Sequence, residues 1–168
     1  FMYNVADSEI DGVKQLLANS DVTTMPWFSM VRGRLVAING DAIKRERMSK
    51  SDALSREVNF TQTSELPESN KVVEGQWWSS APQGIEFSME QEVAKEIGLK
   101  IGDNVEFSVG GIKFTAKLTN IRSVNWQSMN LNFYVIFYPG ALDKFAPNWV
   151  TAVRAKTEDV EYGALAKQ

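Results

Sequence analysis

VEFSVGGIKFTAKLTNI, residues 105–121, is the stretch that decides the fold. Apolar and polar residues alternate on both sides of Gly110 and Gly111. This is the pattern of two antiparallel strands joined by a tight turn, because successive side chains of a strand face opposite sides. Just upstream, a helix is expected to start at Ser88, with Gln91 three residues on, and to end at Gly98. The stretch therefore predicts a helix that leads into a β-hairpin.

Working outward, the N-terminal part is expected to be a strand at 1–5, a helix from Asp7 or Ser8, and strands at 22–29 and 30–38. Residues 44–55 are polar and basic and suit a loop or a short surface helix. Further strands are predicted at 57–63, 71–78, 85–88, 132–137 and 148–155, with a helix from Glu158 onward. This order predicts an α+β protein in which a small β-rich unit interrupts a helix-on-sheet unit.

The composition excludes several kinds of chemistry. The 168 residues include no Cys and no His, which rules out a thiol nucleophile, a Ser-His-Asp triad, a structural zinc site and a disulfide within the chain. The formal net charge of −3 gives no general attraction to nucleic acid. No apolar run approaches the roughly 20 residues of a membrane helix, and no signal peptide is visible. We therefore expect no cofactor, no metal and no nucleic-acid partner.

Two groups of aromatic residues are candidate contact surfaces. Trp77 and Trp78 are neighbours in a predicted strand, so that at most one of them should be buried and the other should belong to an exposed apolar patch. Trp126 and Met129 lie in a predicted loop and suggest the same role. The alternative is that these side chains fold back over a thin core.

Charged residues offer two weaker candidates. Arg32 and Arg34 share one strand face, so they could hold a phosphate or carboxylate, although a salt-bridged sheet face explains them as well. Glu92 and Glu96 share a helix face and could act as an acid/base pair, but a solvated acidic face is the simpler interpretation.

Five segments together resemble one family. They are residues 30–40 (MVRGRLVAING), 56–61 (REVNFT) with Leu66-Pro67 behind it, 73–78 (VEGQWW), 96–103 (EIGLKIGD) and 132–142 (NFYVIFYPGAL). In this order they resemble FtsX/MacB-type ABC transporter permeases, in the YbbP-like branch, and they span most of residues 30–142. The segment 96–103 alone is common, whereas the ordered set is more specific.

The resemblance implies a MacB-like periplasmic core domain inserted between two membrane helices. Residues 1–43 would be the first part of a porter-like helix-on-sheet subdomain, 44–144 a β-rich Sabre-type insert with its connections, and 145–168 the second part of the porter-like subdomain, cut before its last strand. The second of the two extracytoplasmic domains of such a permease is expected, on the strength of residues 31–35.

The resemblance also implies a function. Such permeases couple ATP-driven movement of membrane helices, by mechanotransmission, to their periplasmic part. The chain would be a non-enzymatic domain on the periplasmic side of the bacterial inner membrane, with the nucleotide site on a separate cytoplasmic ATPase subunit. Lipids or other hydrophobic molecules are the expected cargo, and a periplasmic lipase- or esterase-type protein is a plausible partner. The alternatives are a free-standing extracytoplasmic binding module and a carboxylate-based hydrolase that uses Glu92 and Glu96.

Overall fold

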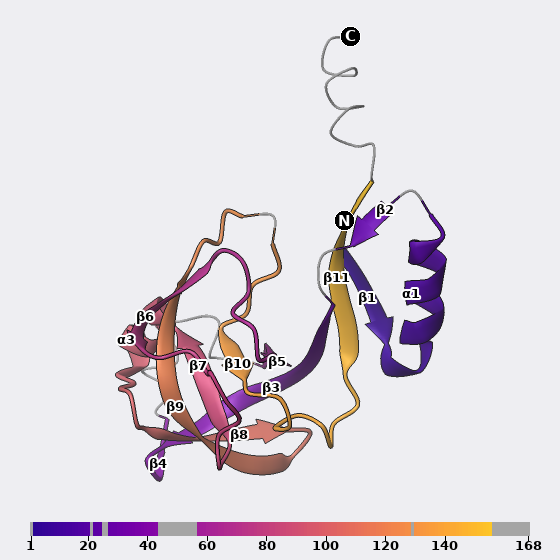
Figure 1. The fold of residues 1–168 in the computed structure, drawn as a ribbon. Helices are drawn as coiled ribbons and strands as arrows, with labels where there is room; N and C mark the ends of the chain where they lie inside the picture. Colours follow the sequence, from indigo (N-terminus) through magenta and orange to yellow (C-terminus); the bar gives the residue numbers. More distant parts are fainter. Residues whose placement is uncertain (1, 21, 25–26, 44–56, 129, 156–168) are drawn as a thin grey trace.

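The computed structural model describes residues 2–20, 22–24, 27–43, 57–128 and 130–155, which form a mixed α and β fold (Figure 1). The α+β class predicted from the sequence is therefore confirmed. In chain order the elements are β1 (Met2–Ala6), the 3-10 turn η1 (Asp7–Glu9), α1 (Ile10–Ala18), β2 (Val22–Thr24), β3 (Phe28–Ile38), β4 (Asp41–Ala42), β5 (Val58–Gln62), β6 (Asn70–Gly75), β7 (Glu86–Glu90), α3 (Gln91–Ile97), β8 (Asn104–Val109), β9 (Ile112–Val124), β10 (Val135–Phe137) and β11 (Asn148–Ala155).

Six strands close into a β-barrel. β3 pairs with β5, β5 with β10, β10 with β7, β7 with β9, β9 with β8, and β8 pairs again with β3. The predicted hairpin is confirmed as β8 and β9, which pair antiparallel up to Val109 and Ile112. The β5–β10 and β7–β9 pairs are parallel, so the ring depends on contacts between distant parts of the chain. Closure leaves none of these six strands as a free edge within the ring.

Aromatic side chains fill the barrel. Phe60, Phe87, Phe107 and Phe137 are fully buried, and the ring centroids of Phe107 and Phe137 lie 4.9 Å apart in an edge-on arrangement. Gly33 on β3 gives the Phe60 ring its room, because a Cβ atom there would lie 2.4 Å from it. Large rings in direct contact contribute most of the apolar burial in a core of this size.

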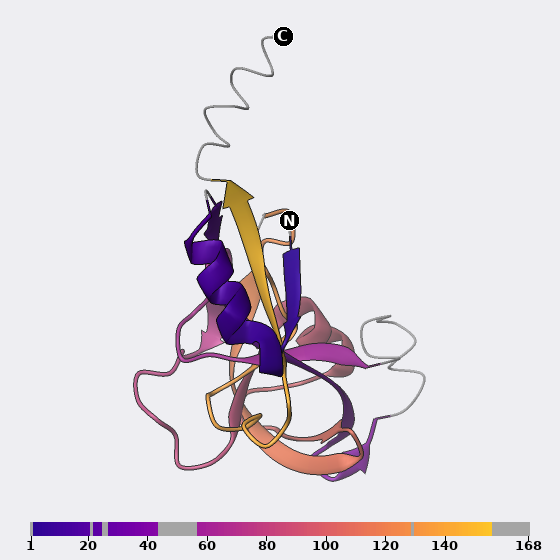
Figure 2. The same ribbon diagram turned by 90° about the vertical axis from the view of Figure 1, so that its right-hand side faces the viewer.

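A second unit packs beside the barrel. β1 and β2 both run antiparallel to β11, one on each side of it, and α1 connects them, which makes a split βαβ unit. Ile10 and Leu17 of α1 are buried, whereas Leu16 is 71% exposed. The helix lies on the side of this sheet that points away from the barrel (Figures 1 and 2).

β3 belongs to both units. Its first residues, 28–30, pair with residues 148–150 of β11, and its remaining residues pair with β5 and β8 of the barrel. A small apolar cluster, centred on buried Phe133, Ile136 and Val150, lies at this junction. Met2 of β1 is opposite Ala152 of β11, so β1 enters and β11 leaves at the same end of the sheet, away from the barrel.

Several sequence expectations need correction at their boundaries. The cap of α3 is Glu90 and not Ser88: both carboxylate oxygens of Glu90 accept backbone N–H groups, of Glu92 at 2.8 Å and Val93 at 3.0 Å. Ser88 lies inside β7, where its side chain accepts a bond from Arg122. Gly98 does end α3 in the left-handed conformation, with φ of 75°.

The strand expected at 71–78 ends at Gly75, whose φ is 72°, so Trp77 and Trp78 lie beyond it. The strand expected at 132–137 comprises only Val135–Phe137. The helix expected from Glu158 lies outside the described residues. Among the helices that the structure describes, none has the length and apolar character needed to span a bilayer.

Candidate functional site

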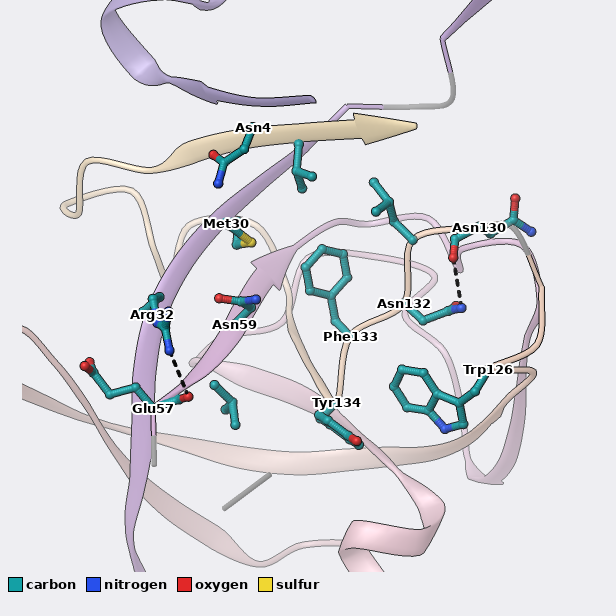
Figure 3. A pocket seen from close by; sticks show the side chains of 13 residues that line it. Asn4, Met30, Arg32, Glu57, Asn59, Trp126, Asn130, Asn132, Phe133 and Tyr134 are labelled. Carbon is teal, nitrogen blue, oxygen red and sulfur yellow. Dashed lines mark hydrogen bonds between the residues drawn. The ribbon is translucent and has the colours of Figure 1, made fainter. Parts of the chain in front are cut away.

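A pocket of about 830 Å³ lies where the split βαβ sheet meets the barrel, and we call it the junction pocket (Figure 3). One wall of the pocket is formed by residues of β1, β3 and β11. The other wall is formed by β5, by Glu57 just before β5, and by the segment that precedes β10. Its lining residues are Asn4, Met30, Arg32, Glu57, Val58, Asn59, Trp126, Asn130, Leu131, Asn132, Phe133, Tyr134 and Val150.

Trp126 and Tyr134 form the aromatic end of the junction pocket. Their ring centroids are 4.8 Å apart, and 46% of Trp126 is exposed to solvent. Figure 3 shows Trp126 and Arg32 on opposite sides of the group of side chains, with Tyr134 between them at its lower edge. Burial, followed by the negative charges of Glu90 and Glu96, raises the pKa of Tyr134, so its phenol stays neutral at physiological pH.

Asn132 holds the segment that carries Trp126. Its side-chain oxygen accepts bonds from Ser69 and Asn70, each at 3.1 Å. Its side-chain nitrogen donates to the Ser128 hydroxyl at 3.3 Å and to the Asn130 carbonyl at 3.1 Å. The donors and acceptors of this amide are therefore used inside the protein, and Asn132 positions the segment.

Arg122 of β9 is a second anchor for the same segment. The side chain is fully buried; Nε donates to Ser88 Oγ at 2.8 Å, Nη1 to Asn70 Oδ1 at 2.8 Å, and Nη2 to the Tyr134 carbonyl at 2.9 Å. Burial lowers the pKa of Arg122 to about 9, and the negative charge of Glu90 opposes this shift. One buried cation thus joins β6, β7 and β9 to the start of β10.

The two predicted arginines separate. Arg32 lines the junction pocket and donates from Nη2 to the Glu57 carbonyl at a long 3.5 Å, so its guanidinium is only weakly held. Arg34 is exposed further along β3 and does not line the junction pocket. The structure brings Arg32 and Trp126, but not Arg34, to one pocket.

Trp77 and Trp78 lie outside the junction pocket. Both are half-buried and pack against each other, with ring centroids 4.3 Å apart, and both belong to the apolar cluster at the junction. Trp77 donates from Nε1 to the Ser64 carbonyl at 2.9 Å, whereas Trp78 Nε1 is buried with no hydrogen-bond partner. They lie in an irregular segment beyond β6, so the strand alternation on which the prediction rested does not apply to them, and neither is fully buried. Met129 lies outside the described residues.

Glu92 and Glu96 do not form a site. Both are exposed on α3, and neither lines any of the pockets described in this part of the chain. Within the same described ranges there is no group of three or more carboxylates that could hold a metal ion. Because Glu92 and Glu96 do not lie together in a described cavity, the geometry does not support the alternative of a carboxylate-based hydrolase.

Sequence reasoning missed Arg122, Asn132 and Tyr134. The register of β9 shifts between its pairings with Phe87 and Ser88 of β7, so the simple alternation of the hairpin does not extend to Arg122. The usable signal was the density of asparagines at 120–132, since closely spaced Asn residues are typical of segments held by side-chain hydrogen bonds.

Comparison with known proteins gives two findings, while no protein-family model matches the chain. Over 154 residues the chain is 36% identical to the uncharacterized ABC transporter permease YbbP of Escherichia coli (strain K12). The match covers 92% of this chain and 18% of that permease. A crystal structure of a domain described as part of a permease from Porphyromonas gingivalis superimposes with a TM-score of 0.44 and 8% identity, over 92% of this chain and 73% of that one.

Proposed function

Because the chain is homologous to a segment of an ABC transporter permease, we propose that it is an extracytoplasmic domain of such a permease. In this role it is a moving part without catalysis of its own. A separate cytoplasmic ATPase subunit hydrolyses ATP, and the membrane helices pass the resulting movement to this domain. The proposal includes a MacB-like arrangement, with a porter-like unit at 1–43 and 145–168 and a Sabre-type insert at 44–144.

The observation that carries the proposal is the path of β3. It is one uninterrupted strand of 11 residues that is hydrogen-bonded to β11 in the split βαβ sheet and to β5 and β8 in the barrel. Backbone hydrogen-bond ladders resist stretching and shear, so a displacement of β11 is passed through β3 to the barrel. Among the described residues three pairs join β3 to β11, so the backbone connection between the two units is short.

The position of the sheet ends supports the same role. β1 enters and β11 leaves side by side, with Met2 opposite Ala152, and the barrel lies at the other end of the sheet. Membrane helices attached at these two ends would act on one end of the sheet, and the barrel would respond at the far end. The junction pocket lies between the two units, where such a movement changes its width.

The cargo and partner surfaces belong to the same proposal. Lipid or another hydrophobic molecule is the cargo, and Trp77, Trp78, Trp126 and Met129 are its contact residues. Arg32 and Arg34, which lie apart on β3, are each either an anion contact or a structural residue. Trp126 fits such a role because 46% of it is exposed beside a pocket. A periplasmic lipase- or esterase-type protein is the partner class proposed for this surface.

Thiol labelling in living cells tests the location. The chain has no Cys, so Leu16→Cys introduces a single thiol in it at a highly exposed position. In the full permease, with any native cysteines replaced, a maleimide that cannot cross the inner membrane should label this thiol in spheroplasts as fully as after lysis. Leu17→Cys, at a buried neighbour, is the matched control and should stay unlabelled until the protein is unfolded. Labelling of Leu16→Cys only after lysis contradicts an extracytoplasmic location, and recovery of the protein away from membranes favours a free-standing binding module.

A further inference from the structure

The junction pocket has unoccupied hydrogen-bonding groups among its apolar walls. Asn4, Asn59 and Asn130 line it; Asn4 and Asn59 are exposed and Asn130 is half-buried, and their side-chain amides make no hydrogen bond to another described residue, so they are open to water or to an occupant. Arg32 adds an exposed guanidinium, to which the described residues offer one long contact. The side chain of Asn132, by contrast, already makes hydrogen bonds within the protein, so it holds its segment in place and is not available to an occupant of the pocket.

These amides disfavour a purely hydrocarbon occupant. Each amide offers a carbonyl acceptor and two N–H donors, and covering it with an acyl chain removes water without replacing its bonds. Three amides that lose their water in this way without gaining a partner would offset much of the gain from apolar contact. The occupant therefore has to bring both donors and acceptors.

The charges of the pocket point to a neutral occupant. Arg32 and Glu57 are the cationic and the anionic residue among the lining side chains, so the formal charges cancel. Trp126 and Tyr134 add aromatic surface at one end, against which a flat, C–H-rich ring face can pack. Hydroxyl groups, each a donor and an acceptor, match amides that offer both.

We propose that the junction pocket binds a neutral, polyhydroxylated ring, that is, a saccharide unit, with Asn4 and Asn59 hydrogen-bonded to its hydroxyls and its ring face on Trp126. Figure 3 shows Asn59 near the middle of the group, between Arg32 and Phe133. A volume of about 830 Å³ is within the range of small-molecule sites and has room for more than one sugar ring. The saccharide could be free or the head group of a glycolipid, and the recognition chemistry is the same. A glycolipid head group would rest on the lipid handling proposed above, whereas binding of a free saccharide does not depend on that proposal.

Binding to the purified 168-residue chain tests this proposal, with intrinsic tryptophan fluorescence as the signal. The soluble probes are maltotriose, chitotriose and raffinose; the membrane probes are phosphatidylcholine vesicles with and without digalactosyldiacylglycerol. Saturable binding of a trisaccharide would show that the pocket binds a free saccharide without a lipid attached to it. Binding only to the galactolipid vesicles identifies the glycolipid head group.

Variants connect the signal to the pocket. Asn59→Leu keeps the side-chain volume but removes the amide, and it should weaken binding about tenfold, the effect of losing one or two hydrogen bonds. Asn148→Leu, at an exposed asparagine on β11 that does not line the pocket, is the matched control and should bind as the natural chain does. Circular dichroism of both variants checks that a loss of binding is not a loss of folding.

Two results overturn the proposal. One is binding to none of the probes; the other is equal binding to plain phosphatidylcholine vesicles, unchanged in Asn59→Leu. Neither result bears on whether the chain is an extracytoplasmic permease domain, because the thiol-labelling experiment decides that separately.

Discussion

Nη2 of Arg122 donates a hydrogen bond to the backbone carbonyl of Tyr134 at 2.9 Å, and this contact fixes a wall of the junction pocket to the barrel. The same guanidinium also bonds Ser88 and Asn70. Arg122 has no exposed surface, so its position does not depend on solvent. The wall that carries Trp126 and Tyr134 is thus held from inside the protein, and its shape follows the barrel strands.

Arg122→Ala should lower the free energy of unfolding by about 3 kcal/mol, because three partners lose a charged donor, fully buried Ser88 among them, and a large buried side chain is removed. Urea unfolding measures the loss. Arg34→Ala, at an exposed position on β3, is the matched control and should change stability by no more than about 0.5 kcal/mol. Equal effects of the two substitutions would mean that the buried network adds no stability.

Asn132→Ala should free the segment that carries Trp126 while leaving the barrel intact. The substitution removes the bonds to Ser69, Asn70 and Ser128. Acrylamide should then quench Trp126 fluorescence more strongly, and amide hydrogens at 125–128 should exchange faster. Asn148→Ala serves as the control, and indistinguishable quenching in the two variants would remove Asn132 as the anchor.

Gly33→Ala tests the close approach between β3 and the barrel core. A Cβ atom at this position would lie 2.4 Å from the Phe60 ring and 2.8 Å from the Ser108 carbonyl oxygen, and a backbone atom cannot easily move away. We expect a loss of about 2 kcal/mol or more in thermal or urea unfolding. Gly12→Ala on α1 meets no atom within 4 Å and should instead stabilise the protein by about 0.5–1 kcal/mol. A Gly33→Ala protein as stable as the natural chain would contradict the packing described.

Tyr134 should show an electrostatic effect of Glu96. The pKa of Tyr134 is raised by burial first, then by Glu90 and Glu96, so Glu96→Gln should lower it while leaving Glu90 as the cap of α3. The folded state holds the phenol proton more tightly than the unfolded state does. This group's contribution to stability is therefore complete below pH 10 and is lost as the pH rises through the raised pKa.

An NMR titration of ¹³Cζ-labelled tyrosine measures this pKa, and Tyr134→Phe assigns the signal among the 4 tyrosines. Glu92→Gln, one turn away on the same helix, is the control because Glu92 does not contribute to the shift. An unchanged Tyr134 pKa in Glu96→Gln would exclude the electrostatic coupling.

The local elements could be predicted from the sequence, but the closed barrel could not. The alternation around Gly110 and Gly111 is a local signal, and it gave β8 and β9 correctly. The barrel closes through the parallel β5–β10 and β7–β9 pairs, which join residues distant in sequence and leave no periodic pattern. The cap of α3 is Glu90 and not the predicted Ser88, because β7 extends two residues further than expected and places Ser88 inside the sheet.

The candidate site was predictable only in part. Trp126 and Arg32 stand out as an exposed aromatic and a charged strand residue, and the fold brings both to the junction pocket. The anchor Arg122 could not be predicted, because a buried arginine looks the same in a sequence as a solvated surface arginine. For Asn132 the closely spaced asparagines at 120–132 were a signal, but they do not show which partners it has. Their role comes from partners at 69–70 and 88, which only the tertiary structure brings near.

The most direct test of the central claim is a distance measurement across β3 in the full permease with its ATPase. Nitroxide labels at Leu16→Cys on α1 and Ile101→Cys beside the barrel occupy exposed positions on the two units, and the chain contributes no other thiol. If β3 passes ATP-driven movement from the sheet to the barrel, the distance distribution measured by pulsed electron paramagnetic resonance should differ between the nucleotide-free and the ATP-trapped permease. Identical distributions in the two states would contradict the coupling.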